Sequence, residues 1–270
     1  WNTGDTTALI DSLPAGMYRC TLTDANGCSL ISPLYELTQD QILQVEVDLE
    51  KDISCFGADD GAIFLSLSGG AAPYDFLWND GDTSEDRQQL SSVKYQVTVT
   101  DQQGCERVFG PIDITEPDPL LVEVVNVEDV VCSGQDNGSI DIQAMGGTPP
   151  YDFSWNNTAE TEDLNGLPIG FYKVTAVDQN GCAFTSPSIS VSEPPPLEGQ
   201  VLSSQQPDCN GSDGGSADIG ISGGVPPYSF AWSNGSTNED LDNVSAGTYA
   251  VTVTDANDCK LILPVVEVLE

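Results

Sequence analysis

Cysteines are the residues of this sequence most clearly arranged for chemistry, because six of the eight fall into three pairs with a constant spacing. The two members of a pair lie 50 residues apart, and the pairs are Cys55/Cys105, Cys132/Cys182 and Cys209/Cys259. The chain has no histidine and no C-x-x-C motif, so disulfides are favoured over zinc sites. We expect one disulfide inside each pair, which adds ~4 kcal/mol to stability in the chain-entropy model. Such bonds imply an oxidising, extracytoplasmic location.

The other two cysteines lie outside these pairs. Cys28 has the phase of the second member of a pair, so its expected partner lies 50 residues upstream, before the first residue of this sequence. Cys20 stands where the other copies of the pattern have valine, at Val97, Val174 and Val251. One interpretation is a buried thiol that packs as a small hydrophobic side chain. The alternative is a second disulfide to a partner outside this sequence.

Aspartates recur in two loops, where their oxygens are candidate ligands for a hard cation. One loop has the pattern C-x-G-x-D-x-G and the other is a D-x-x-G-C turn, whose last copy has Asp258 in place of glycine. A disulfide within each unit would draw the two loops together at one end of the domain, and converging carboxylates are suited to Ca²⁺. The candidate ligands are Asp59, Asp101, Asp136, Asp178, Asp213 and Asp255. The alternative is that these aspartates accept backbone hydrogen bonds in Asx-turns.

A second group of acidic residues follows each tryptophan-containing segment. It consists of Glu85-Asp86, Glu162-Asp163 and Glu239-Asp240, whereas Ala8 and Leu9 occupy the same positions near the start of the chain. This group is a further candidate cation site.

Catalysis is not indicated. Without histidine, the usual general base and the Ser-His-Asp and Cys-His arrangements are missing. Paired carboxylates are plentiful, but their recurrence in every copy of the pattern argues for architecture. No glycine-rich phosphate loop follows a strand and opens a helix. We therefore expect a protein that is not an enzyme and has no cofactor, with Ca²⁺ as the one alternative.

Charge and hydropathy limit the partners. Seven Lys+Arg stand against 43 Asp+Glu, which gives a net charge of −36 and disfavours nucleic acid and anionic membranes as partners. No run of 18 apolar residues is present, so we expect no membrane insertion. The first residues, WNTGDTTALI, do not read as a signal peptide. An export signal is expected either outside this sequence or already removed.

A repeat of 77 residues organises all of these positions. Four tryptophans expected in the core keep this step, and they are Trp1, Trp78, Trp155 and Trp232. The period predicts a C-terminal half of a repeat at 1–38 and full repeats at 39–115, 116–192 and 193–270. An array that begins in mid-repeat favours a window of a longer chain. The alternative is a half-domain completed by strands donated by another molecule, as in a self-assembling extracellular filament.

Each repeat reads as all-β. Within the first full repeat, residues 42–50, 62–68, 74–78 and 94–100 alternate apolar and polar side chains, and 107–115 supplies a last strand. The phrase SGGAAPYDFLW (68–78) recurs as GGTPPYDFSW and SGGVPPYSFAW, and places a turn before each aromatic strand. Proline-rich junctions predict short, stiff linkers. We expect tandem immunoglobulin-like or PKD-like β-sandwiches arranged as an elongated rod.

The succession of motifs resembles the SprB-type repeat of bacterial surface adhesins. The last repeat shows it nearly whole, as CNGSDGGSADIGISGGVPPYSFAWSNGSTNEDL followed by AGTYAVTVTDANDC. The resemblance implies immunoglobulin-like domains in very long proteins on the surface of Bacteroidetes, some of which serve gliding motility and attachment after type IX secretion. It also makes Ser12, in the sequence DSL, a candidate O-glycosylation site.

The expected function is therefore a structural or adhesive segment of a very long extracellular repeat protein, acting as a stalk or surface fibre. One alternative is an array of carbohydrate- or protein-binding modules, and the other is the filament subunit described above. The expected partners are neighbouring repeats, together with a surface polysaccharide or protein ligand. The expected location is the cell surface.

Overall fold

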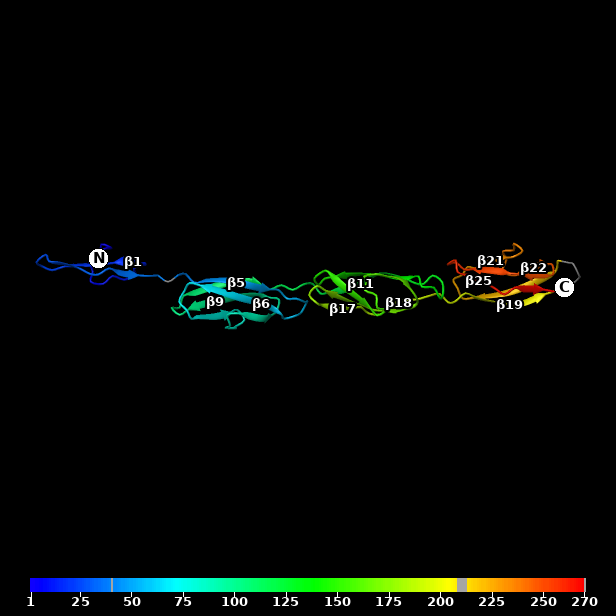
Figure 1. Ribbon diagram of the computed structural model, residues 1–270, viewed down its shortest axis with the longest axis horizontal. Coiled ribbons are helices and arrows are strands. Elements are labelled where there is room, and N and C mark those ends of the chain that lie inside the picture. Colours follow the sequence, from blue (N-terminus) through cyan, green and yellow to red (C-terminus); the bar gives the residue numbers. More distant parts are fainter. Residues whose placement is uncertain (40, 208–212, 270) are drawn as a thin grey trace. The chain divides into compact units, whose positions relative to one another are not determined.

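The computed structural model describes residues 1–39, 41–207 and 213–269, and every regular element in these ranges is a β-strand (Figure 1). The predicted all-β class is confirmed. The chain divides into two compact units, residues 1–116 and 117–270. Nothing in the described ranges is a helix with the length and hydropathy needed to cross a membrane.

The first unit contains one full repeat of two antiparallel sheets. One sheet has the order β5-β6-β8, with strands Gln44–Lys51, Gly61–Ser68 and Arg87–Leu90. The other has the order β10-β9-β7, with strands Glu106–Asp113, Lys94–Asp101 and Tyr74–Trp78. The predicted alternation explains this pairing, because successive side chains of a strand point to opposite faces and one face of each sheet is apolar.

Ahead of this repeat, residues 1–38 form two small hairpin-like pairs. Strands β1 (Gly16–Tyr18) and β4 (Tyr35–Leu37) pair with each other, as do β2 (Thr21–Thr23) and β3 (Ser29–Ile31).

The second unit contains two further repeats with the same strand pairing. In the second repeat the sheets are β11-β12-β14 (Leu121–Glu128, Gly138–Met145, Leu164–Leu167), β13-β16-β17 (Tyr151–Trp155, Val174–Asp178, Ala183–Thr185) and β15-β18 (Gly170–Tyr172, Ile189–Val191). In the third they are β19-β20-β22 (Glu198–Gln205, Gly215–Ser222, Leu241–Val244), β21-β24-β25 (Ser229–Trp232, Val251–Thr254, Lys260–Ile262) and β23-β26 (Gly247–Tyr249, Val266–Val268).

Each full repeat has its own hydrophobic core, and the three cores lie within residues 43–114, 130–191 and 217–268. Trp78, Trp155 and Trp232 are buried at their centres, whereas Trp1 is half-buried. The polar edge of each buried indole is satisfied, because Nε1 donates to a backbone carbonyl six residues downstream. The repeats are therefore small β-sandwiches around a central tryptophan, as expected for an immunoglobulin-like fold.

The turn that precedes each aromatic strand is fixed by glycine. Gly146 has φ +71°, and a Cβ there would lie 2.1 Å from the carbonyl oxygen of Pro119. The following residue, Gly147, donates its N–H to the carbonyl of Asp118. The double glycine thus holds the incoming linker against the turn, and a side chain at Gly146 would separate them.

Candidate functional site at a repeat junction

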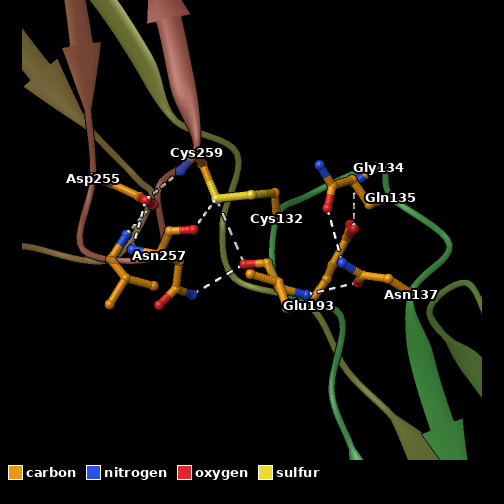
Figure 2. Close-up of a disulfide and its surroundings, with 10 residues drawn as sticks. Cys132, Gly134, Gln135, Asn137, Glu193, Asp255, Asn257 and Cys259 are labelled. Atoms are coloured by element: carbon orange, nitrogen blue, oxygen red, sulfur yellow. Dashed lines mark hydrogen bonds between the residues drawn. A yellow bond between two sulfur atoms is a disulfide. The ribbon is translucent and has the colours of Figure 1, made fainter.

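A disulfide joins two different repeats of the second unit. Cys132 lies in the C-x-G-x-D-x-G loop of the second repeat, and Cys259 ends the D-x-x-G-C turn of the third (Figure 2). The two cysteines are separated by 127 residues in sequence, and their Cα atoms lie 5.7 Å apart. The bond therefore crosses the junction between consecutive repeats.

This bond corrects the predicted pairing of cysteines within each repeat. Cys132 was expected to bond to Cys182 and Cys259 to Cys209, and both predictions are wrong. Cys209 itself lies outside the described residues.

Strand direction gives the physical reason for the correction. In the second repeat, β12 starts at Gly138 beside the C-x-G loop and ends at Met145 beside the double-glycine turn. Tyr151 begins the next strand and is the register partner of Asp178, so the D-x-x-G-C turn lies at the double-glycine end. An eight-residue strand spans about 23 Å, far beyond the Cα separation of a disulfide. The two loops of one repeat lie at opposite ends of the sandwich.

The linker between the two repeats is held by both of them. On the side of the second repeat, Glu193 Oε2 accepts a hydrogen bond from Gly134 N at 2.7 Å, and Asp129 Oδ1 accepts one from Ser192 N at 2.7 Å. On the side of the third repeat, Pro195 O accepts a hydrogen bond from Gly224 N at 2.9 Å. These contacts fix where the third repeat begins relative to the C-x-G loop, and so bring the two cysteines together.

A hydrogen bond accompanies the disulfide across the junction. Asn257 Nδ2, in the turn of the third repeat, donates to the backbone oxygen of Val131 at 3.0 Å (Figure 2). Val131 N in turn donates to Asn137 Oδ1 at 3.0 Å, which closes the C-x-G loop. The junction thus combines a covalent bond with a network of backbone hydrogen bonds.

The aspartate of the D-x-x-G-C turn organises the side of the junction that carries Cys259. Asp255 is buried, and its Oδ1 accepts hydrogen bonds from the N–H groups of Asn257 and Cys259 at 2.9 Å each. Its Oδ2 accepts a third, from Val225 N at 2.9 Å, which ties the turn to the double-glycine turn. Burial raises the pKa of Asp255, but these three donors outweigh it and hold the pKa below its ordinary value.

The same aspartate recurs with the same partners in the other full repeats. Asp101 accepts from Gln103, Cys105 and Ala71, and Asp178 accepts from Asn180, Cys182 and Thr148. The hydrogen bond from Cys105 N is the main cause that lowers the pKa of Asp101. In residues 1–38, Asp24 accepts the two equivalent bonds from Asn26 and Cys28. This is the Asx-turn geometry that the sequence left open.

The proposed calcium ligands do not come together within one repeat. Asp59, Asp136 and Asp213 are exposed on the C-x-G loops, at the opposite end from Asp101, Asp178 and Asp255. The described residues contain no group of three or more potential ligands around one point. The expectation that both loops meet at one end of a domain is wrong. Calcium binding by either set stays an untested prediction.

The second acidic group also has a structural contact. Oδ1 of Asp86, Asp163 and Asp240 accepts a hydrogen bond from the backbone N–H of Leu65, Ile142 and Ile219, respectively. Each aspartate therefore fastens the loop after the tryptophan strand to the middle strand of the facing sheet.

The remaining predicted positions lie in residues 1–38. Ser12 is exposed, and its backbone has φ +55°. Cys20 is half-buried and donates its N–H to Ser32 Oγ, and Cys28 is exposed. None of these positions contributes to the junction.

Sequence reasoning missed a buried cation in the first full repeat. Arg87 packs its guanidinium over the rings of Trp78 and Tyr95, with Cζ 5.3 and 5.6 Å from the ring centroids. It also forms two hydrogen bonds with Asp80, at 2.7 and 3.1 Å. The other repeats have Asn157 and Leu164, or Asn234 and Leu241, at these two positions. The change of both residues together in one repeat was the available signal.

Comparison with known proteins agrees with this architecture at the level of the repeat. No curated protein matches the chain. The three N-terminal domains of the bacteriophage RB49 Hoc protein are 12% identical, with 85% of this chain and 100% of that chain covered and a TM-score of 0.42. A tetra-tandem repeat from the extending region of a large adhesion protein is 15% identical, with 93% and 80% covered and a TM-score of 0.27. Extracellular domains 3–5 of Drosophila OTK are 12% identical, with 78% and 91% covered and a TM-score of 0.27.

A family model gives the more specific result. The SprB repeat matches three times, at residues 51–83, 124–160 and 201–237. Each match begins near the end of the first strand and runs through the C-x-G loop and the double-glycine turn to just past the tryptophan. The chain therefore carries three SprB repeats in tandem.

Proposed function

We propose that this chain is a structural segment of a very long extracellular protein, in which tandem SprB repeats form a stalk or surface fibre for adhesion or gliding motility. The observation that carries the proposal is the bonded junction, because it uses conserved loop chemistry of this chain to hold one repeat to the next. The three matches to the SprB repeat support an extracellular, adhesion-type structural role. The disulfide supports an oxidising compartment, where such bonds persist.

The acidic residues support the same interpretation. Each recurring aspartate of the D-x-x-G-C turn spends both carboxylate oxygens on backbone N–H groups, so it serves the fold and is not displayed for a reaction. The net charge of −36 supports solubility of a long chain and repulsion between neighbouring fibres. We infer a structural role without catalysis. Type IX export, a glycan at Ser12 and a polysaccharide or protein ligand are finer parts of this proposal.

The experiment that tests the proposal uses antibodies raised against the purified chain. On intact host cells we expect surface labelling without permeabilisation, and we expect bound Fab fragments to reduce attachment of the cells to glass. Labelling that appears only after permeabilisation would contradict the extracellular role. Surface labelling with unchanged attachment and gliding would leave a surface fibre but would contradict its part in adhesion and motility.

A further inference from the structure

We propose that the bond between Cys132 and Cys259 is one rung of a disulfide ladder that runs through the array. In this ladder, the first cysteine of each repeat bonds to the second cysteine of the repeat that follows. For this chain the rule assigns Cys55 to Cys182, which hold the positions of Cys132 and Cys259 one period earlier. The inference goes beyond the proposed function, because it holds whether or not the protein mediates adhesion.

The loop that carries the first cysteine is built in the same way in both copies. In the first unit, Gly57 N donates to Glu116 Oε2 at 2.7 Å, and in the second unit Gly134 N donates to Glu193 Oε2 at the same distance. Likewise, Thr115 N donates to Asp52 Oδ1 at 2.7 Å, as Ser192 N does to Asp129 Oδ1. The linker therefore leaves each of these repeats with the same fastening to its C-x-G loop.

The turn that carries the second cysteine is also the same in both copies. Cys182 N donates to Asp178 Oδ1 at 2.8 Å, and Cys259 N donates to Asp255 Oδ1 at 2.9 Å. The linker before each turn is fastened alike, because Gly147 N donates to Asp118 O at 2.7 Å and Gly224 N to Pro195 O at 2.9 Å. Both halves of the bonded junction thus recur, with the same residue spacing, at the preceding junction.

Formation of the bond requires an oxidant, which we take to be a small-molecule or protein disulfide. One cysteine thiolate attacks the oxidant disulfide, forms a mixed disulfide and releases one thiolate of the oxidant. The second cysteine thiolate then attacks the mixed disulfide at the sulfur of the first cysteine and displaces the other oxidant thiolate. The repeat pair loses two protons and two electrons, and the oxidant becomes two thiols.

The ladder has a mechanical consequence. A repeat bonded at both ends, as the second repeat is in this scheme, carries its bonds at Cys132 and Cys182, which lie 50 residues apart. The covalent path through such a repeat then contains 50 residues instead of 77. At ~3.6 Å per extended residue, an unfolded repeat lengthens to about 18 nm instead of about 28 nm. The ladder would limit extension of the array under tension without adding any residue.

Peptide mapping of the whole oxidised chain tests the ladder. Cleavage after glutamate puts the five relevant cysteines on separate peptides: 51–85 with Cys55, 86–106 with Cys105, 129–160 with Cys132, 163–198 with Cys182 and 240–267 with Cys259. The chain is oxidised with glutathione disulfide, alkylated under denaturing conditions and digested without reductant. We expect peptide 51–85 linked to 163–198. Linkage of 51–85 to 86–106, or an alkylated Cys55, would overturn the proposal.

Two matched variants separate the rungs. Cys182→Ser should leave Cys55 alkylated while 129–160 stays linked to 240–267. Cys105→Ser should leave both linked pairs in place. Loss of the 51–85 to 163–198 link in Cys105→Ser, or its persistence as another Cys55 link in Cys182→Ser, would contradict the assigned pair.

Discussion

Removal of the disulfide between Cys132 and Cys259 should destabilise two repeats at once. We consider Cys132→Ser, Cys259→Ser and the double variant of the whole chain. Because one bond joins the two repeats, either single substitution removes the same cross-link, and the second substitution has nothing further to remove. The three variants should therefore lose the same free energy of unfolding.

The size of the loss follows from the closed loop. A loop of 127 residues gives about 5 kcal/mol in the chain-entropy model, against about 4 kcal/mol for a loop of 50 residues. The difference between these values is too small to identify the bond. Additivity identifies it, because bonds in separate repeats would give losses that add in the double variant, to about 8 kcal/mol.

Guanidinium unfolding followed by tryptophan fluorescence measures these losses, since Trp155 and Trp232 are buried in the two repeats. Cys28→Ser is the control, because Cys28 is exposed and free. We expect the control to match the parent chain, and the single and double variants to coincide with one another and with the reduced parent at that bond. A double variant that is less stable than either single variant by several kcal/mol would refute the crossing bond.

Three further predictions concern other contacts. Asp80→Asn alone should lower stability by about 1–2 kcal/mol, because it leaves the buried Arg87 without its bidentate partner, whereas Asp80→Asn with Arg87→Leu, the residue types of the other repeats, should restore it; thermal unfolding measures both. The hydrogen bond from Lys51 holds the pKa of Asp60 at about 2, so this contact stabilises the fold above pH 4 and is lost as the pH falls from about 4 to 2; an NMR titration in which Lys51→Gln leaves that pKa unchanged would contradict this. Gly146→Ala should cost about 1–3 kcal/mol more than Gly181→Ala, because both glycines have positive φ but only Gly146 would place a Cβ against Pro119 O; equal losses in urea unfolding would contradict the steric argument.

The fold could be predicted because its signals are local and repeated. Alternation of apolar residues indicates the strands, and the 77-residue step places Trp78, Trp155 and Trp232 in equivalent cores. The double glycines also announce their turns, since positive φ at Gly146 excludes most other residues. Each of these inferences needs only neighbours in sequence or one period of the repeat.

The disulfide could not be predicted from spacing alone, because a constant spacing of 50 residues is compatible with bonds inside a repeat and with bonds across a junction. Deciding between them requires the direction of every strand between Cys132 and Cys182, and the short strands β14 and β15 are not evident from alternation. The same error brought the two acidic loops together on one side. Hydrogen bonds to backbone N–H groups, which explain Asp255, likewise depend on a turn distant in sequence.

The central claim is that a covalent bond crosses the junction between consecutive repeats, and cutting the linker tests it most directly. A site-specific protease sequence is inserted after Pro196, between the second and third repeats, and the purified chain is cut and analysed by gel electrophoresis. Without reductant, the cut protein should migrate as one species because Cys132 still holds Cys259, and reductant should release two fragments. Two fragments without reductant would show that each repeat keeps its disulfides to itself and would contradict the account.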